Sequence, residues 1–115
     1  MEKLVTVVEI PNFSSRAKGL LSPALREEIA VLVAEDPTYG DLMVGTGGCR
    51  KGRLALEGRG KSGSVRFVYL YCGDGKPIFL VALFAKNEKS NLTKSERNNL
   101  AKVAKAICKT YGARK

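Results

Sequence analysis

Two stretches near the middle of the chain combine glycines with basic side chains, in a pattern suited to binding an anion. They span residues 45–53 and 58–66 and hold three basic residues each: Arg50, Lys51 and Arg53, then Arg59, Lys61 and Arg66. Glycine lets a backbone approach a ligand closely, because it has no Cβ. Arg and Lys bind phosphate through a planar fork and a point charge respectively. The pattern predicts contact with a phosphate-rich polymer, and the alternative is a solvated loop.

The distribution of charge supports this prediction. Sixteen of the 20 Lys and Arg residues follow residue 45, whereas the first 45 residues carry seven acidic and four basic side chains. Segregated positive charge is typical of proteins that bind nucleic acid. An anionic membrane would also attract it, but the basic stretch has no Trp or Phe cluster to bury in lipid. Nucleic acid is therefore favoured, and no membrane partner is expected.

Length and composition limit the class of protein. A chain of 115 residues with 44% hydrophobic residues is expected to form a single globular domain over residues 1–115. Only five residues separate Lys3 from Glu9, which is too short for a signal-peptide core, so we expect a cytoplasmic protein. The absence of histidine excludes Ser–His and Cys–His nucleophile pairs. Any catalysis must use other side chains or a nucleophile of the substrate.

The three cysteines, Cys49, Cys72 and Cys108, are far apart and have no histidine near them. Their spacing matches no zinc site, and no metal or other cofactor is expected. Disulfides are rare in a reducing compartment. We therefore expect Cys72 and Cys108 to be small apolar core residues.

Periodicity and turn signals predict the elements that position the basic residues. Strands are expected at residues 4–10, 50–56, 65–72 and 78–84, with the last as the central strand. Asn12 is expected to cap a short first helix, Ser22-Pro23 to begin a second, and Thr93-x-x-Glu96 to begin the last. The order β-α-α-β-β-β-α predicts an α+β fold with a mainly antiparallel four-stranded sheet. Lys51 and Arg53 then share one strand face.

With these motifs in order, the chain resembles the RelE superfamily of bacterial toxins, and its HigB-like branch in particular. The matching segments are Gly45-Thr46-Gly47-Gly48-x-Arg50-Lys51-x-Arg53, Gly58-Arg59-Gly60-Lys61-Ser62-Gly63, Arg66-x-x-Tyr69, Ala85-Lys86-Asn87-Glu88-Lys89 and Leu92-Thr93-x-x-Glu96. The resemblance implies a RelE-like fold and the toxin of a type II toxin–antitoxin system. Such toxins are endoribonucleases (mRNA interferases), and many cut mRNA in the ribosomal A site.

The resemblance also implies residue roles and partners. The implied catalytic residues are Lys51, Arg53, Arg66 and Lys86, and the nucleic-acid-binding residues are Arg50, Arg59, Lys61, Asn87 and Lys89. The implied partners are mRNA, the ribosome and a cognate antitoxin, expected to be a small helix-turn-helix protein. RNA supplies its own nucleophile, the 2′-hydroxyl, so the reaction requires no metal.

The sequence departs from the family pattern at two positions, and the family's C-terminal tyrosine has no clear counterpart. Gly52 replaces a usually apolar residue, which is expected to loosen the strand. Asn87 stands where some relatives have a second basic residue. Tyr111, on the apolar stripe of the last helix, is expected in the core rather than at a catalytic position. These departures leave open an alternative, a non-catalytic RNA- or DNA-binding module or a degenerate toxin that acts with its antitoxin as a repressor.

Overall fold

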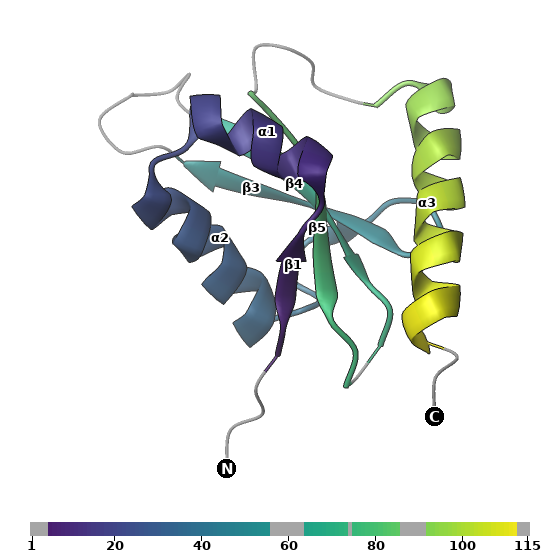
Figure 1. The fold of residues 1–115 in the computed structure, drawn as a ribbon. Coiled ribbons are helices and arrows are strands. Elements are labelled where there is room, and N and C mark those ends of the chain that lie inside the picture. Colours follow the sequence, from purple (N-terminus) through teal and green to yellow (C-terminus); the bar gives the residue numbers. More distant parts are fainter. Residues whose placement is uncertain (1–4, 56–63, 74, 86–91, 113–115) are drawn as a thin grey trace.

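The computed structural model describes residues 5–55, 64–73, 75–85 and 92–112, with side chains described as far as residue 110. Within these ranges, three helices and a mixed five-stranded sheet follow the order β-α-α-β-β-β-β-α (Figure 1). The predicted α+β class is confirmed. The extra strand is a two-residue pairing that follows the helical hairpin, and it is too short to show any periodicity in the sequence.

The sheet has the spatial order β1-β5-β4-β3-β2. Its strands are β1 (Val7–Glu9), β2 (Asp41–Leu42), β3 (Cys49–Ala55), β4 (Ser64–Tyr71) and β5 (Ile78–Ala85). β1 pairs with β5 in parallel, and the other pairs are antiparallel. The prediction of four strands is therefore wrong by one, and β4, not β5, is the central strand. β1 is also shorter than expected, because only three of its residues pair with β5.

The helices are α1 (Pro11–Leu20), α2 (Pro23–Glu35) and α3 (Lys94–Gly112). Two predicted start signals are confirmed. The Ser22 hydroxyl accepts a hydrogen bond from the Leu25 amide at 3.2 Å, and Thr93 and Glu96 cap each other reciprocally at 2.9 and 3.1 Å. The predicted Asn12 cap is wrong. The N-cap is Ile10, two residues earlier, because Pro11 has the backbone angle of a first helical residue and no amide hydrogen to satisfy.

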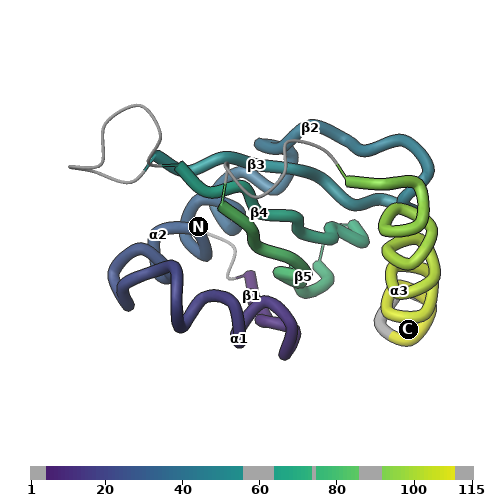
Figure 2. The backbone as a smooth tube through the Cα atoms, turned by 90° about the horizontal axis from the view of Figure 1, so that it is seen from above, coloured from purple at the N-terminus to yellow at the C-terminus, as the bar shows by residue number. Residues whose placement is uncertain are grey.

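Each face of the sheet packs against different helices. On one face, α1 and α2 contribute Phe13, Ala17, Ile29 and Val33 to a buried cluster with Val65, Phe67 and Tyr69 of β4. On the other face, α3 contributes Ala104 to a cluster with Cys49, Val68, Leu70 and Phe79. Viewed from above, α3 stands at one end of the sheet, and α2 lies towards the other (Figure 2). This leaves a part of the second face without a helix over it.

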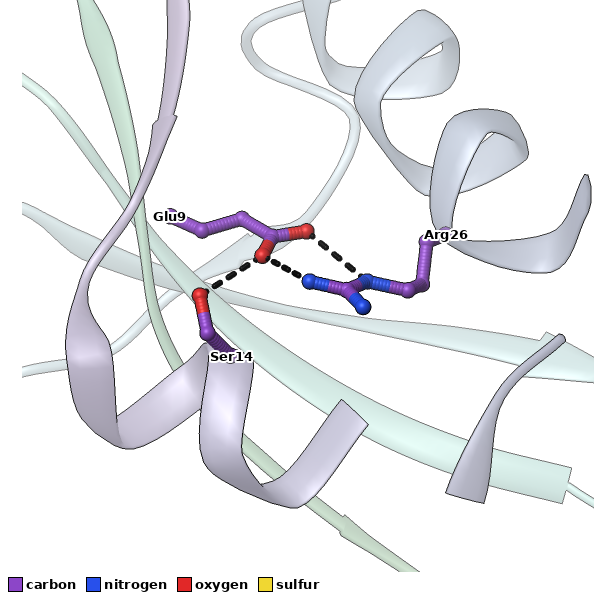
Figure 3. A network of polar contacts seen from close by, with 3 residues as sticks. All are labelled: Glu9, Ser14 and Arg26. Atoms are coloured by element: carbon purple, nitrogen blue, oxygen red, sulfur yellow. Dashed lines mark hydrogen bonds and ion pairs between the residues drawn. The ribbon is translucent and has the colours of Figure 1, made fainter. Parts of the chain in front are cut away.

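A polar network ties the helical hairpin to β1 (Figure 3). The Glu9 carboxylate accepts hydrogen bonds from the Ser14 hydroxyl at 2.7 Å and from two nitrogens of the Arg26 guanidinium, with Nε at 3.2 Å. These bonds lower the pKa of Glu9, chiefly through the hydrogen bond from Arg26. Since the three residues belong to β1, α1 and α2, one carboxylate fixes the angle between these elements.

The structure overturns the expectation for Cys72 and Cys108. These two cysteines form a disulfide with a Cα–Cα distance of 5.5 Å and a sequence separation of 36. Cys72 follows the end of β4, and Cys108 lies one turn after Ala104 on the face of α3 that packs on the sheet. Sequence spacing could not reveal the pair, because only the packing of α3 brings the two positions together. The disulfide fixes α3 at its end of the sheet.

Candidate nucleic-acid interface

Three of the predicted site residues lie on one face of the sheet. Arg53 is directly opposite Arg66, and Lys51 is directly opposite Val68, in the antiparallel register of β3 and β4. Directly opposite residues point to the same side of a sheet, and Val68 belongs to the cluster on the α3 side. Lys51, Arg53 and Arg66 therefore share the α3 side of the sheet. We call these three residues the basic face.

The basic face begins where the contacts of α3 end. Along β3, the side chains on this side are Cys49, then Lys51, then Arg53, and only Cys49 is fully buried in the α3 cluster. Arg53 is exposed, and Lys51 is half-buried. In Figure 1, β3 runs away from α3, so that successive residues lie farther from the helix. α3 therefore forms one wall beside the basic face rather than a cover over it.

Arg66 is the most unusual member of the basic face. Its side chain is half-buried, and its Nε is fully buried without a hydrogen-bond partner among the described residues. Its cross-strand neighbour is another arginine, Arg53, and like charges directly opposite each other destabilise a sheet. A buried donor without a partner also costs free energy. An anion such as phosphate bound between the two arginines would offset their mutual repulsion, because a phosphate oxygen accepts from guanidinium groups.

A comparison with known protein families adds an independent finding. Residues 25–114 match the model of a family described as RelE toxin of RelE / RelB toxin-antitoxin system. The chain belongs to the RelE toxin family. As a RelE-family toxin, it is the toxin component of a toxin–antitoxin pair, and its expected protein partner is an antitoxin. None of the described helices is long and apolar enough to cross a membrane.

Arg50 lies apart from the basic face of this RelE-family toxin. It is opposite Tyr69, whose ring packs in the α1–α2 cluster, so Arg50 points to that side of the sheet. Its guanidinium donates hydrogen bonds to the Gly40 carbonyl at 2.8 Å and to the Thr38 carbonyl at 3.5 Å. Arg50 therefore has a structural role in the loop before β2, and the structure does not bring it together with Lys51 and Arg66.

The tyrosine of the Arg66-x-x-Tyr69 motif supports the same loop. Tyr69 is fully buried. Its hydroxyl donates to the Pro37 carbonyl and accepts from the Gly40 amide, each at 2.8 Å, and burial raises the pKa of this hydroxyl. Residues three apart on a strand point to opposite faces. The spacing of the motif could therefore have shown in advance that Tyr69 and Arg66 serve different sides of the sheet.

The glycines of residues 45–48 serve a turn that packs on α3. Gly45, Gly47 and Gly48 all have positive φ, and a Cβ on Gly47 would lie 3.3 Å from the Ala104 Cβ. Inside the turn, the buried Thr46 hydroxyl donates to the Met43 carbonyl at 2.6 Å and accepts from the Cys49 amide at 3.2 Å. The close approach that glycine permits here is to a helix. This first glycine stretch therefore positions β3 and its basic residues.

Gly52 does not loosen β3, contrary to the expectation from sequence. It is opposite Phe67, and a Cβ on Gly52 would lie 2.5 Å from Cζ of the phenyl ring. The ring therefore covers the glycine backbone, and both residues are buried. Phe67 from the neighbouring strand fills the space that a side chain at this position would occupy. The departure is compensated within the fold.

Cys49 is not an available nucleophile. It is buried, at 1% exposure, and burial raises the pKa of its thiol to about 11. The thiol is therefore protonated at neutral pH, whereas nucleophilic attack needs the thiolate. The groups that this face offers to a ligand are therefore its Lys and Arg side chains.

Several predicted site residues lie outside the described parts of the chain. They are Arg59, Lys61, Lys86, Asn87 and Lys89. The backbone of Tyr111 belongs to α3, and its side chain is not described. The roles that the family resemblance implies for these residues stay predictions.

Proposed function

We propose that this RelE-family toxin is an endoribonuclease that cuts mRNA in the ribosomal A site, as expected for the HigB-like branch. The observation that carries the proposal is the environment of the Arg66 guanidinium. Its buried Nε has no partner among the described residues, and it faces the like-charged Arg53. A site with these properties is suited to an anion held by two guanidinium groups, and a phosphodiester of RNA is such an anion.

The proposed reaction uses the 2′-hydroxyl of the RNA as nucleophile. The 2′-oxygen loses its proton to a base and attacks the adjacent phosphorus, and the bond to the 5′-oxygen breaks as that oxygen gains a proton. The products are a 2′,3′-cyclic phosphate and a 5′-hydroxyl. Arg66 and Arg53 stabilise the negative charge that develops on the phosphorane. Lys51 acts as the base or the acid, and Lys86 acts at the leaving group. No metal or other cofactor takes part.

Replacement of Arg66 tests the proposal. Induced expression of the wild type should arrest growth and produce new mRNA 5′ ends, and Arg66→Ala should do neither while remaining folded. Lys105→Ala is the matched control, because Lys105 is an exposed basic residue of α3 that lies off its apolar stripe. Growth arrest by a well-expressed Arg66→Ala variant would remove Arg66 from the catalytic residues.

A second experiment tests the nucleophile. An RNA with 2′-deoxyribose at the cut position should resist cleavage, whereas the same substitution one nucleotide downstream should not. Cleavage of the first substrate would mean that water is the nucleophile. This experiment can be run with ribosomes, because it does not require removal of the magnesium that ribosomes themselves need.

The alternative function is a non-catalytic RNA- or DNA-binding module that acts with the antitoxin as a repressor. One part of its sequence support was Gly52, and Phe67 removes that part by covering the glycine. One measurement distinguishes the two functions. A non-catalytic module binds RNA or operator DNA but generates no new mRNA 5′ ends when expressed without its antitoxin.

We further propose that the antitoxin, a small helix-turn-helix protein, binds the flank formed by α2 and the β2 edge. This flank carries exposed apolar side chains, with Val31 of α2 at 45% and Leu42 of β2 at 58% exposure. Lys51→Ala and Arg66→Ala should then keep antitoxin affinity within a few-fold of the wild type. A loss of about 3 kcal/mol, the scale of one buried interfacial charge pair, would place the antitoxin on the basic face.

A further inference from the structure

We propose that the cavity between α1, β5 and α3 binds a nucleobase of the RNA substrate, next to the phosphate held by Arg66 and Arg53. This inference rests on the proposed endoribonuclease function and deepens it, because it assigns the part of the molecule that reads the base. None of the residues in this cavity was among the site residues predicted from the sequence.

The floor of the cavity is apolar and formed by β5. The cavity has a volume of about 520 Å³, and its floor includes Val81, Ala82 and Phe84. A register shift between Val68 and Tyr69 of β4 makes Val81 an extra residue of β5. Val81 and Ala82 therefore both join the α3-side cluster, as expected for a β-bulge. The result is a broader apolar surface than regular alternation would give, and the faces of all nucleobases stack well on apolar surfaces.

The cavity adjoins the basic face through a single residue pair. Phe84 in its floor is directly opposite Arg66 in the pairing of β5 with β4. Neighbouring strands lie about 4.8 Å apart, so the cavity begins one strand away from the proposed phosphate site. A nucleotide has the same arrangement, since its base lies one sugar away from its phosphate. A base can therefore enter the cavity while the phosphate remains between Arg66 and Arg53.

The rim of the cavity supplies groups that can recognise the edge of a base. Asn12 of α1 and Asn99 of α3 both line it, and both side chains are exposed. A carboxamide offers both a donor and an acceptor, which is the usual way to read a base edge. On the α1 wall, the Arg16 Nε donates to the Leu83 carbonyl at 3.1 Å. A polar rim with an adjoining phosphate site favours a nucleotide over an apolar segment of a protein partner.

The test uses a short RNA that cannot be cut, with 2′-deoxyribose at the cleavage position, and follows the methyl groups of the protein by NMR. The wild-type RNA complex should shift the methyl signals of Val81, Leu92 and Leu100 in the cavity. Val103→Trp, which fills the cavity from α3, should weaken binding about tenfold, the effect of losing one base contact, and abolish these shifts. Val31→Trp is the matched control. Val31 is also an exposed helical valine, at 45% against 42% for Val103, but it lies on α2, and this variant should bind RNA like the wild type.

Cleavage mapping adds a second readout. Asn99→Ala should change the base preference at the cut sites while cleavage continues, whereas Arg66→Ala should stop cleavage at all sites. If the wild type cuts RNA but the cavity methyl signals do not respond to the RNA, the nucleobase assignment is overturned and the endoribonuclease proposal stands. If the cavity binds RNA but the wild type never cuts, the endoribonuclease proposal fails and the nucleobase site stands. A response of these methyl groups to the antitoxin alone would assign the cavity to the protein partner instead.

Discussion

The position of the Arg66 side chain costs the folded protein stability. Its buried Nε has no partner among the described residues, and Arg53 lies directly opposite. Methionine has a similar length to the aliphatic part of arginine and carries neither the charge nor the donor. We therefore expect Arg66→Met to raise the free energy of unfolding by about 1 kcal/mol and to abolish cleavage. Urea unfolding beside a growth assay measures both effects, and a less stable Arg66→Met would show that the guanidinium has a partner in the folded protein.

At Gly52, we expect a substitution to lower the free energy of unfolding rather than raise it. Gly52→Ala should lower the free energy of unfolding by about 1–3 kcal/mol, because the new Cβ would lie 2.5 Å from the Phe67 ring. Gly19→Ala is the control, since Gly19 lies in α1 and a Cβ added there would meet nothing within 4 Å, and it should stabilise the protein by about 0.5–1 kcal/mol. Adding Phe67→Leu should recover part of the loss in Gly52→Ala. Equal effects of the two alanine substitutions would contradict the packing argument.

At the scale of elements, one carboxylate connects β1 with both helices of the hairpin. Because Arg26 lowers the pKa of Glu9, this group stabilises the folded state at pH values above its unfolded pKa, and the stabilisation is lost as pH falls through its folded pKa. Arg26→Gln should therefore lower the free energy of unfolding at pH 6, and the difference from the wild type should shrink as the pH is lowered below about 4. Denaturant unfolding at several pH values measures this. A difference that stays constant with pH would mean that Arg26 acts through packing alone.

The elements also show which features a sequence can reveal. Helix starts at Ser22 and Thr93 were predictable because a cap depends on residues within three positions of each other. The shared face of Lys51 and Arg53 was predictable from the two-residue period of a strand. β2, the disulfide and the cavity were not predictable, because each depends on the packing of segments far apart in the chain. The separation of Arg50 from the basic face could have been predicted, since neighbours on a strand point to opposite sides.

At the scale of the whole molecule, the disulfide holds α3 to the rest of the fold. It closes a loop with a sequence separation of 36, and a disulfide of this loop length stabilises a protein by about 3–4 kcal/mol in the chain-entropy model. A thiol reductant should therefore lower the unfolding midpoint of the wild type and leave that of Cys108→Ser unchanged. Thermal unfolding with and without the reductant measures the effect. Equal midpoints for the oxidised wild type and Cys108→Ser would mean that the disulfide adds no stability.

The parallel pairing of β1 with β5 has a consequence for synthesis. Val7 pairs with Ile78, and Glu9 with Leu80, so β1 leaves the ribosome before its partner strand, which is made about seventy residues later. Contacts between such distant positions slow folding, because the intervening chain must first be ordered. The sheet can therefore be completed only when most of the nascent chain has emerged. A toxin built in this way stays incompletely folded for most of its own translation. An antitoxin already present in the cell therefore has time to bind it as it folds.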